Sequence, residues 1–230
     1  AALGIPSLSM LDLFGLPGDP FLVRPVHADC ITVLSAGVAD NLVRAGIPRE
    51  RLAVTGNPAF DILSRPEAQV AGRAWRAAKG WQDKHVVLWA GDREPDDADP
   101  AWAGTALGEQ VQAALFDWLQ RHEDACMAIR YHPNEWHRFS RLPEHPRLHW
   151  SQPGQEDLTP VLMAADQVVV QITTVGVQAY TAGKRLVNLG FSPTVQRSGL
   201  DYARLGMGEA AASLAHLAQL LDAGLGHRAA

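Results

Sequence analysis

Residues 167–184 have the sequence QVVVQITTVGVQAYTAGK. The valine-rich run at residues 167–172 predicts a strand that is covered on both faces, as strands of parallel sheets usually are. The turn Thr173-Thr174-Val175-Gly176 then opens a helix that we expect to end at Gly183. A strand, a short polar turn and a helix in this order are typical of an α/β fold with a parallel sheet.

Units of the same kind recur along the chain and extend this prediction. We expect the strands Ile5–Leu11, Cys30–Leu34, Arg51–Val54, Val86–Ala90, Ala125–Tyr131, Leu148–Trp150, Gln167–Ile172 and Arg185–Leu189. Helical periodicity predicts the helices Ala36–Ala45, Glu67–Lys79 and Leu107–Arg121, with Ser35 as the cap of the first. The apolar residues that should face inward include Val38, Leu42, Val43, Val70, Ala71, Ala74, Trp75, Ala78 and Trp118.

A proline-containing segment at Ser64-Arg65-Pro66 predicts a boundary between residues 1–64 and 65–230. A doubly wound nucleotide-binding domain usually has about six strands, and only three are expected before the boundary. Residues 1–64 are therefore predicted to be the C-terminal part of an incomplete Rossmann-like domain, and residues 65–230 a second Rossmann-like domain. Ala1–Pro6 is typical of the last turn of a helix followed by a glycine stop.

The composition is that of an ordinary globular protein, with 47% hydrophobic and 20% charged residues. A formal net charge of −5 offers no general attraction to nucleic acid or to an anionic membrane, so a phosphate must be bound locally. No segment has the apolar length of a membrane span, and no signal peptide opens the chain, which predicts a cytoplasmic protein. Cys30 and Cys126 lie in apolar runs and are expected to be buried free thiols.

Ligands of open α/β sheets bind beyond the carboxyl ends of the strands, where the starts of helices can hold anions. Thr173 and Thr174 supply hydroxyls there, and Gly176 lets a ligand approach the backbone, which together predict a cradle for a diphosphate. The alternative is an ordinary threonine cap between a strand and a helix.

Three further strand ends carry candidate binding residues. Pro133 stops one strand and directs His132 and Asn134 to the same rim, where a histidine can donate to a phosphate or exchange a proton. Gly91 keeps the backbone open at a second rim, and Arg93 either reaches a phosphate or pairs with acidic neighbours. Arg197 lies in the polar segment 190–199, which either closes over a sugar or is a plain surface connection.

Several kinds of site have no support in the sequence. The histidines lack the spacings that zinc requires, and no P-loop, serine-hydrolase elbow or dinucleotide-binding glycine motif is present. The acidic stretch 92–100 lacks the glycine turn of a calcium loop and is expected to be solvated. We therefore predict no metal and no cofactor.

Three stretches resemble the GT-B superfamily, especially the UDP-N-acetylglucosamine 2-epimerases and their glycosyltransferase relatives. The first combines residues 28–35 with Gly46-Ile47-Pro48 and Val54-Thr55-Gly56-Asn57-Pro58, and is similar to the end of the family's N-terminal domain. The second is the His132-Pro133-Asn134 element. The third extends from Ala164 to Lys184 and resembles the element that binds diphosphate and ribose in relatives.

The resemblance implies a UDP-sugar-binding enzyme, and its departures concern the reaction. Gln178 stands where relatives have a ribose-binding carboxylate, and an amide can still bond a ribose hydroxyl. Asp12 is the carboxylate left at the position of an epimerase acid/base element, so Asp12 and His132 are the predicted catalytic residues. An epimerase would have a pair of glutamates in the element where this chain has Val177-Gln178, and their loss favours glycosyl transfer over 2-epimerisation.

A non-catalytic nucleotide-binding or regulatory module is the alternative from another functional class. The predicted partners are a nucleotide sugar and an acceptor that the sequence does not define, and a homodimer is left open.

Overall fold

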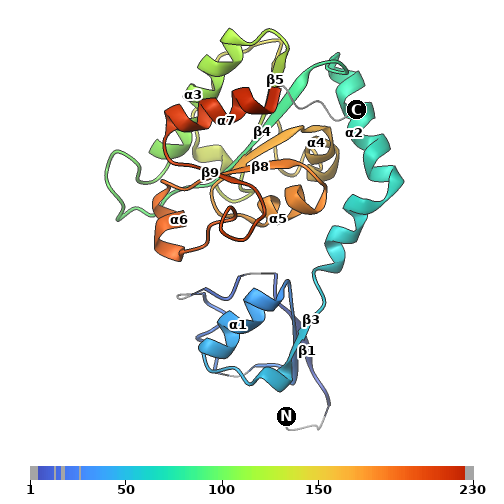
Figure 1. Ribbon diagram of the computed structural model, residues 1–230, viewed down its shortest axis with the longest axis vertical. Coiled ribbons are helices and arrows are strands. Elements are labelled where there is room, and N and C mark those ends of the chain that lie inside the picture. Colours follow the sequence, from blue (N-terminus) through green and yellow to red (C-terminus); the bar gives the residue numbers. More distant parts are fainter. Residues whose placement is uncertain (1–4, 13, 17–18, 26, 226–230) are drawn as a thin grey trace. The chain divides into compact units, whose positions relative to one another are not determined.

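The computed structural model describes residues 5–12, 14–16, 19–25 and 27–225 (Figure 1). The chain divides into two compact units, which we call unit 1 (Ala1–Asp61) and unit 2 (Ile62–Ala230). This division lies a few residues before the predicted boundary at Ser64-Arg65-Pro66. The predicted helix end at residues 1–4 lies outside the described residues.

Unit 1 contains a three-stranded parallel sheet in the order β1-β2-β3. Helix α1 covers it with Val38, Ala39 and Leu42, which pack on the fully buried Ile31 and Val33. The elements are β1 (Leu8–Met10), β2 (Cys30–Val33), α1 (Ala36–Arg44), the 3-10 helix η1 (Arg49–Arg51) and β3 (Leu52–Val54).

In unit 1 the predicted cap of α1 is confirmed, and two predictions about burial are wrong. The Ser35 hydroxyl caps α1, since it accepts a hydrogen bond from the Val38 N–H at 3.3 Å. Val43, however, is 40% exposed, because Val38, Ala39 and Leu42 already define the buried face of this short helix. Cys30 is only half-buried, because β2 buries just its Ile31 and Val33 positions fully.

Unit 2 is built on a six-stranded parallel sheet in the order β6-β5-β4-β7-β8-β9. The order reverses at β4, which pairs with β5 on one side and β7 on the other, so the switch point of the sheet lies between β4 and β7. The elements are η2 (Pro58–Ser64, which spans the division), α2 (Pro66–Lys79), β4 (His85–Gly91), α3 (Ala106–Arg121), β5 (Ala125–Tyr131), η3 (Trp136–Arg138), β6 (Leu148–Trp150), α4 (Leu158–Ala164), β7 (Gln167–Val170), α5 (Thr174–Thr181), β8 (Arg185–Leu189), α6 (Pro193–Ser198), β9 (Glu209–Ala211) and α7 (Leu214–Leu225).

Helices lie on both faces of this sheet, as its valine-rich strands predicted (Figure 1). Val87 and Trp89 of β4 belong to a buried cluster with α3 and α7, and the period of two along the strand turns Val86 and Leu88 to the other face. Helix α4 contacts β4, and α2 packs against α4. The predicted α/β class with parallel sheets is confirmed.

The sequence missed strand β9. The alanine run 210–212 has the composition of a helix, and no strand is predicted after Leu189, yet Asn188 and Ala210 are paired between β8 and β9, and α7 begins only at Leu214. Pairing at a free sheet edge outweighs the weak helical preference of a few alanines.

The buried face of α2 also differs from the predicted stripe. Ala68, Gly72 and Trp75 are buried, whereas Val70 is 55% exposed. Gly72 allows α2 to lie close to α4, because a methyl group at this position would lie only 2.7 Å from the Met163 Cβ of α4.

Both tryptophans that were expected to pack are buried. Trp118 is 1% exposed and donates its indole N–H to Asp222, and Trp75 is 9% exposed and donates to Glu156. Cys126 is buried as expected, and burial raises the pKa of its thiol to about 11. Among the described residues, no helix combines the length and the apolar character needed to cross a membrane.

Replacing Gly176 by alanine should lower the free energy of unfolding by about 1–3 kcal/mol, because the new methyl group would overpack its site. Its Cβ would lie 2.4 Å from the ring of Tyr202. Gly37→Ala in α1 is the control, since its Cβ meets only the Ser35 hydroxyl at 3.8 Å. Urea unfolding of both variants tests the prediction, and equal stability of Gly176→Ala and the unaltered protein would contradict it.

Candidate functional site

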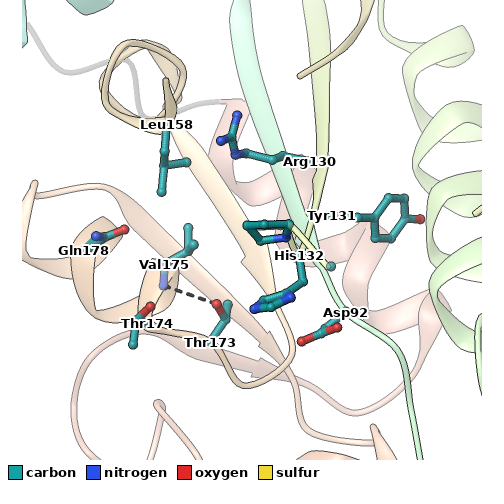
Figure 2. Close-up of a pocket in the computed structure, with 12 residues that line it drawn as sticks. Asp92, Arg130, Tyr131, His132, Leu158, Thr173, Thr174, Val175 and Gln178 are labelled. Atoms are coloured by element: carbon teal, nitrogen blue, oxygen red, sulfur yellow. Dashed lines mark hydrogen bonds between the residues drawn. The ribbon is translucent and has the colours of Figure 1, made fainter. Parts of the chain in front are cut away.

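A pocket of about 260 Å³ lies at the carboxyl ends of β4, β5 and β7, at the switch point of unit 2 (Figure 2). Its wall combines two turns that follow strands with the start of α5. The lining residues are Ala90, Gly91, Asp92, Arg130, Tyr131, His132, Pro133, Leu158, Thr173, Thr174, Val175 and Gln178. Five of the residues predicted for nucleotide-sugar binding therefore meet here: Gly91, His132, Thr173, Thr174 and Gln178.

The two threonines at the start of α5 have different roles. The Thr173 hydroxyl accepts a hydrogen bond from the Val175 N–H at 3.4 Å and so caps the helix, which was the alternative considered for this turn (Figure 2). None of the described residues bonds the Thr174 hydroxyl, which remains available to a ligand at the positive end of the helix dipole.

Gly176 lies against Tyr202 and is absent from the pocket lining. The Tyr202 hydroxyl donates to the Thr173 carbonyl at 2.6 Å. The missing side chain of Gly176 therefore admits a tyrosine that supports the turn, and its contribution to ligand binding is indirect.

Gln178 lies one turn further along α5 and lines the pocket. Its Oε1 atom is buried and accepts no hydrogen bond from the described residues. A buried acceptor without a donor is costly, so this oxygen favours a ligand that brings a hydroxyl or amide donor.

His132 presents its ring to the pocket from the end of β5 (Figure 2). Its Nδ1 atom accepts from the Asn134 N–H at 3.3 Å, which leaves Nε2 as the atom that carries the proton in the neutral ring. His132 can thus donate to a bound oxygen. Asn134 acts here through its backbone, and its side chain is exposed outside the pocket lining.

Asp92 is a pocket residue that the sequence analysis did not single out. Its N–H donates to the Gln171 Oε1 at 2.7 Å, and its Oδ1 accepts from the Arg93 N–H at 2.8 Å. Burial raises the pKa of this carboxyl above its ordinary value, with smaller effects from neighbouring charges. A charged residue directly after a buried strand and a glycine is the signal that could have identified it.

Glu94 overturns the expectation that the whole acidic stretch 92–100 is solvated. Glu94 is only 2% exposed, and its carboxylate accepts hydrogen bonds from the Gln171 amide, the Ser192 hydroxyl and both the N–H and the hydroxyl of Thr194. Four donors compensate for the burial of its charge. The same contacts fix the start of helix α6, in the segment 190–199 that was expected to be a polar loop, to Glu94 in the loop after β4.

The two arginines predicted for phosphate binding are outside the pocket lining. Arg93 pairs with Asp96 and lies 3.7 Å from the Glu135 carboxylate, and Arg197 pairs with Asp97. For Arg93 the structure shows the alternative considered above, an ion pair with an acidic residue of the same loop.

Arg130 is the arginine that does line the pocket. One guanidinium nitrogen donates to the Ser151 hydroxyl and the Glu156 carbonyl, and burial lowers the pKa of the side chain. The sequence signal that could have identified Arg130 is a cationic residue within an otherwise apolar strand, two positions before His132.

Asp12, the other predicted catalytic residue, belongs to unit 1. It is exposed and follows β1 at the carboxyl edge of the small sheet, where the Leu11 N–H donates to the Thr32 carbonyl. Within the described part of the chain, no cluster of three or more histidine, cysteine or carboxylate side chains could hold a metal ion.

Comparison with known proteins places the fold. No protein-family description and no curated protein matches the sequence. The UDP-GlcNAc 2-epimerase of Methanocaldococcus jannaschii, solved with UDP-GlcNAc and UDP, aligns with a TM-score of 0.59 at 15% identity, over 87% of this chain and 55% of its own. The wall teichoic acid polymerase TagF aligns with a TM-score of 0.62 at 15% identity, over 84% and 48%.

Anabaena Alr3699/HepE, solved with UDP and glucose, aligns with a TM-score of 0.52 at 15% identity, over 95% of this chain and 61% of its own. The chain thus spans about half the length of the solved structures that it matches. At these identities the comparisons establish architecture and leave the reaction open. The chain has the GT-B-type, Rossmann-like fold that UDP-GlcNAc 2-epimerases, TagF and HepE share.

Proposed function

We propose that the pocket of unit 2 binds a UDP-sugar and that the chain is part of a glycosyltransferase. The observation that carries this proposal is the convergence of three groups at the switch point of one sheet: the Thr174 hydroxyl, the unpartnered Gln178 Oε1 and the His132 ring. They suit an anionic diphosphate flanked by a hydroxyl-bearing ribose. Solved neighbours that contain UDP, UDP-GlcNAc or glucose support the same ligand class.

Each group has a distinct part in the proposed complex. Thr174 and the start of α5 hold a phosphate, and Gln178 accepts a ribose hydroxyl proton in its hydrogen bond. His132 donates from Nε2 to the phosphate oxygen, which becomes more negative as the bond to the sugar breaks.

The proposed transfer needs a base for the acceptor. The acceptor oxygen attacks the anomeric carbon, the bond between that carbon and the phosphate oxygen breaks, and UDP leaves with the bonding electrons. Asp12 takes the proton of the acceptor hydroxyl. The neutral Gln178, in place of a carboxylate expected for an epimerase, favours transfer over 2-epimerisation.

Replacing Thr174 by valine is expected to weaken UDP binding about 10-fold, because one hydrogen bond to a charged phosphate is lost while the shape of the side chain is kept. Isothermal titration calorimetry with UDP, UDP-GlcNAc and NAD measures the effect. Thr181→Val at the other end of α5 is the matched control, since among the described residues its hydroxyl bonds only the Val177 carbonyl. Absence of any UDP binding to the unaltered protein would contradict the proposal.

Measurements of enzymatic turnover distinguish glycosyl transfer from 2-epimerisation and from nucleotide binding without catalysis. A UDP-release assay with candidate acceptors, run beside an epimerisation assay with UDP-GlcNAc, should show UDP release without epimerised product. UDP binding without either activity would instead identify a nucleotide-binding module.

A further inference from the structure

The Asp92 carboxylate is held in one position at the pocket wall. Its N–H donates to Gln171, whose amide donates to the buried Glu94, and its Oδ1 accepts from the Arg93 N–H. Within the described residues, the second oxygen accepts no hydrogen bond and makes no ion pair with a lysine or arginine, and the His132 ring is an electrostatic neighbour of the carboxyl in the pocket wall. A fixed carboxylate oxygen is thus available to a ligand.

Asp92 lies at the side of the pocket where one end of the proposed UDP-sugar would be bound. Figure 2 shows Gln178 and Asp92 on opposite sides of the pocket, with Thr173 and Thr174 between them. With the ribose at Gln178 and the diphosphate at Thr174, the group attached to the diphosphate extends toward Asp92. This assignment rests on the proposed function.

An ionised carboxylate accepts hydrogen bonds and donates none, so it binds hydroxyl groups and repels other anions. Arg130 and Arg93, the arginines in and beside the pocket, are both held by other groups. Arg130 is engaged with Ser151 and Glu156, and Arg93 is paired with Asp96 outside the pocket. A negatively charged transferred group beside Asp92 would therefore be repelled by this carboxylate, while the charge of Arg130 is held at Ser151 and Glu156.

We propose that Asp92 is a specificity-determining residue that accepts a hydrogen bond from a hydroxyl of the transferred group and selects neutral, polyhydroxylated sugars against acidic ones. The Glu94–Gln171 pair positions it. Burial raises the pKa of this carboxyl because it disfavours the charged form, so a hydrogen bond donated by a ligand hydroxyl would stabilise the carboxylate.

Calorimetry on the full chain tests the proposal with three ligands: UDP, UDP-glucose and UDP-glucuronic acid. The unaltered protein should bind UDP-glucose at least about 10-fold more tightly than UDP-glucuronic acid, since the two differ by one carboxylate. Asp92→Asn should weaken UDP-glucose about 10-fold and reduce the preference over UDP-glucuronic acid, while UDP affinity changes less than about two-fold.

The matched control is Asp99→Asn, the same change on the same loop at an exposed side chain whose hydrogen bond from the Ala101 N–H an amide oxygen can keep. It should leave all three affinities unchanged. Equal losses of UDP and UDP-glucose in Asp92→Asn would overturn the proposal, because Asp92 would then act on the nucleotide or on the fold. A gain in UDP affinity with Mg²⁺ that Asp92→Asn abolishes would also overturn it, since Asp92 would be a cation ligand.

Two measurements keep the test independent of folding and of the proposed function. Equal affinities of the unaltered protein for UDP-glucose and UDP-glucuronic acid refute the selection without any variant. If UDP does not bind at all, the proposed function fails; if UDP binds and depends on Thr174 but Asp92→Asn is silent, only the role of Asp92 fails.

Discussion

Asp12→Asn is expected to lower the rate of glycosyl transfer by about 10²- to 10⁴-fold, the usual contribution of a positioned general base. An amide cannot take the proton of the acceptor hydroxyl, whereas its size and hydrogen-bonding reach are nearly those of the carboxylate. Asp12 is not among the residues that line the pocket, so UDP affinity should stay the same. UDP release under saturating donor measures the rate, and calorimetry measures the affinity.

The control for this experiment is Asp40→Asn, an exposed carboxylate of α1 in the same unit. Asp40→Asn should have the same transfer rate and the same free energy of unfolding as the unaltered protein. Should Asp12→Asn transfer sugar at the unaltered rate, the catalytic assignment is wrong even if the pocket binds UDP. A fall in UDP affinity would show instead that the substitution acts on binding.

Glu94→Leu is expected to lower the free energy of unfolding of unit 2 by about 3–5 kcal/mol. The change keeps the approximate volume but leaves the buried donors of Gln171, Ser192 and Thr194 without an acceptor. Urea unfolding followed by tryptophan fluorescence tests it. Under conditions where the variant remains folded, UDP-glucose affinity should also fall, because Gln171 no longer holds Asp92 in place.

The control is Glu144→Leu, an exposed glutamate on the loop before β6. Its effect should lie within about 0.5 kcal/mol, as for most surface substitutions. A loss of similar size in both variants would mean that the apolar side chain, and not the broken network, is responsible. Unchanged stability of Glu94→Leu would contradict the structural importance of the network.

The architecture was largely readable from the sequence because it depends on short-range periodicity. The predicted strands Ala125–Tyr131, Leu148–Trp150 and Arg185–Leu189 have the observed bounds, and the strand at residues 167–172 ends two residues early, where the polar turn begins. Ser35 before an amphipathic run and Gly80 after another set the helix ends through capping.

The predictions of the fold were wrong where a contact with a residue distant in the sequence determines the local structure. Glu209–Ala211 is a strand because β8 offers a free edge, and no periodicity within three residues indicates that. Val70 looks apolar and inward by spacing, yet the close approach of α4 at Gly72 turns another face of α2 to the core. Local pattern defines an apolar stripe but does not choose the neighbour that covers it.

By itself the sequence determined the α/β class, most strand positions and the strand ends at which His132, Thr173 and Thr174 lie. Only the tertiary structure decided which polar groups are free to bind: Thr173 is used as a cap, Arg93 and Arg197 are paired with carboxylates, and Asp92 and Arg130 line the pocket. The physical reason is that a side chain's availability depends on whether distant residues satisfy its hydrogen bonds and charge, as the burial of Glu94 among donors from two distant segments shows.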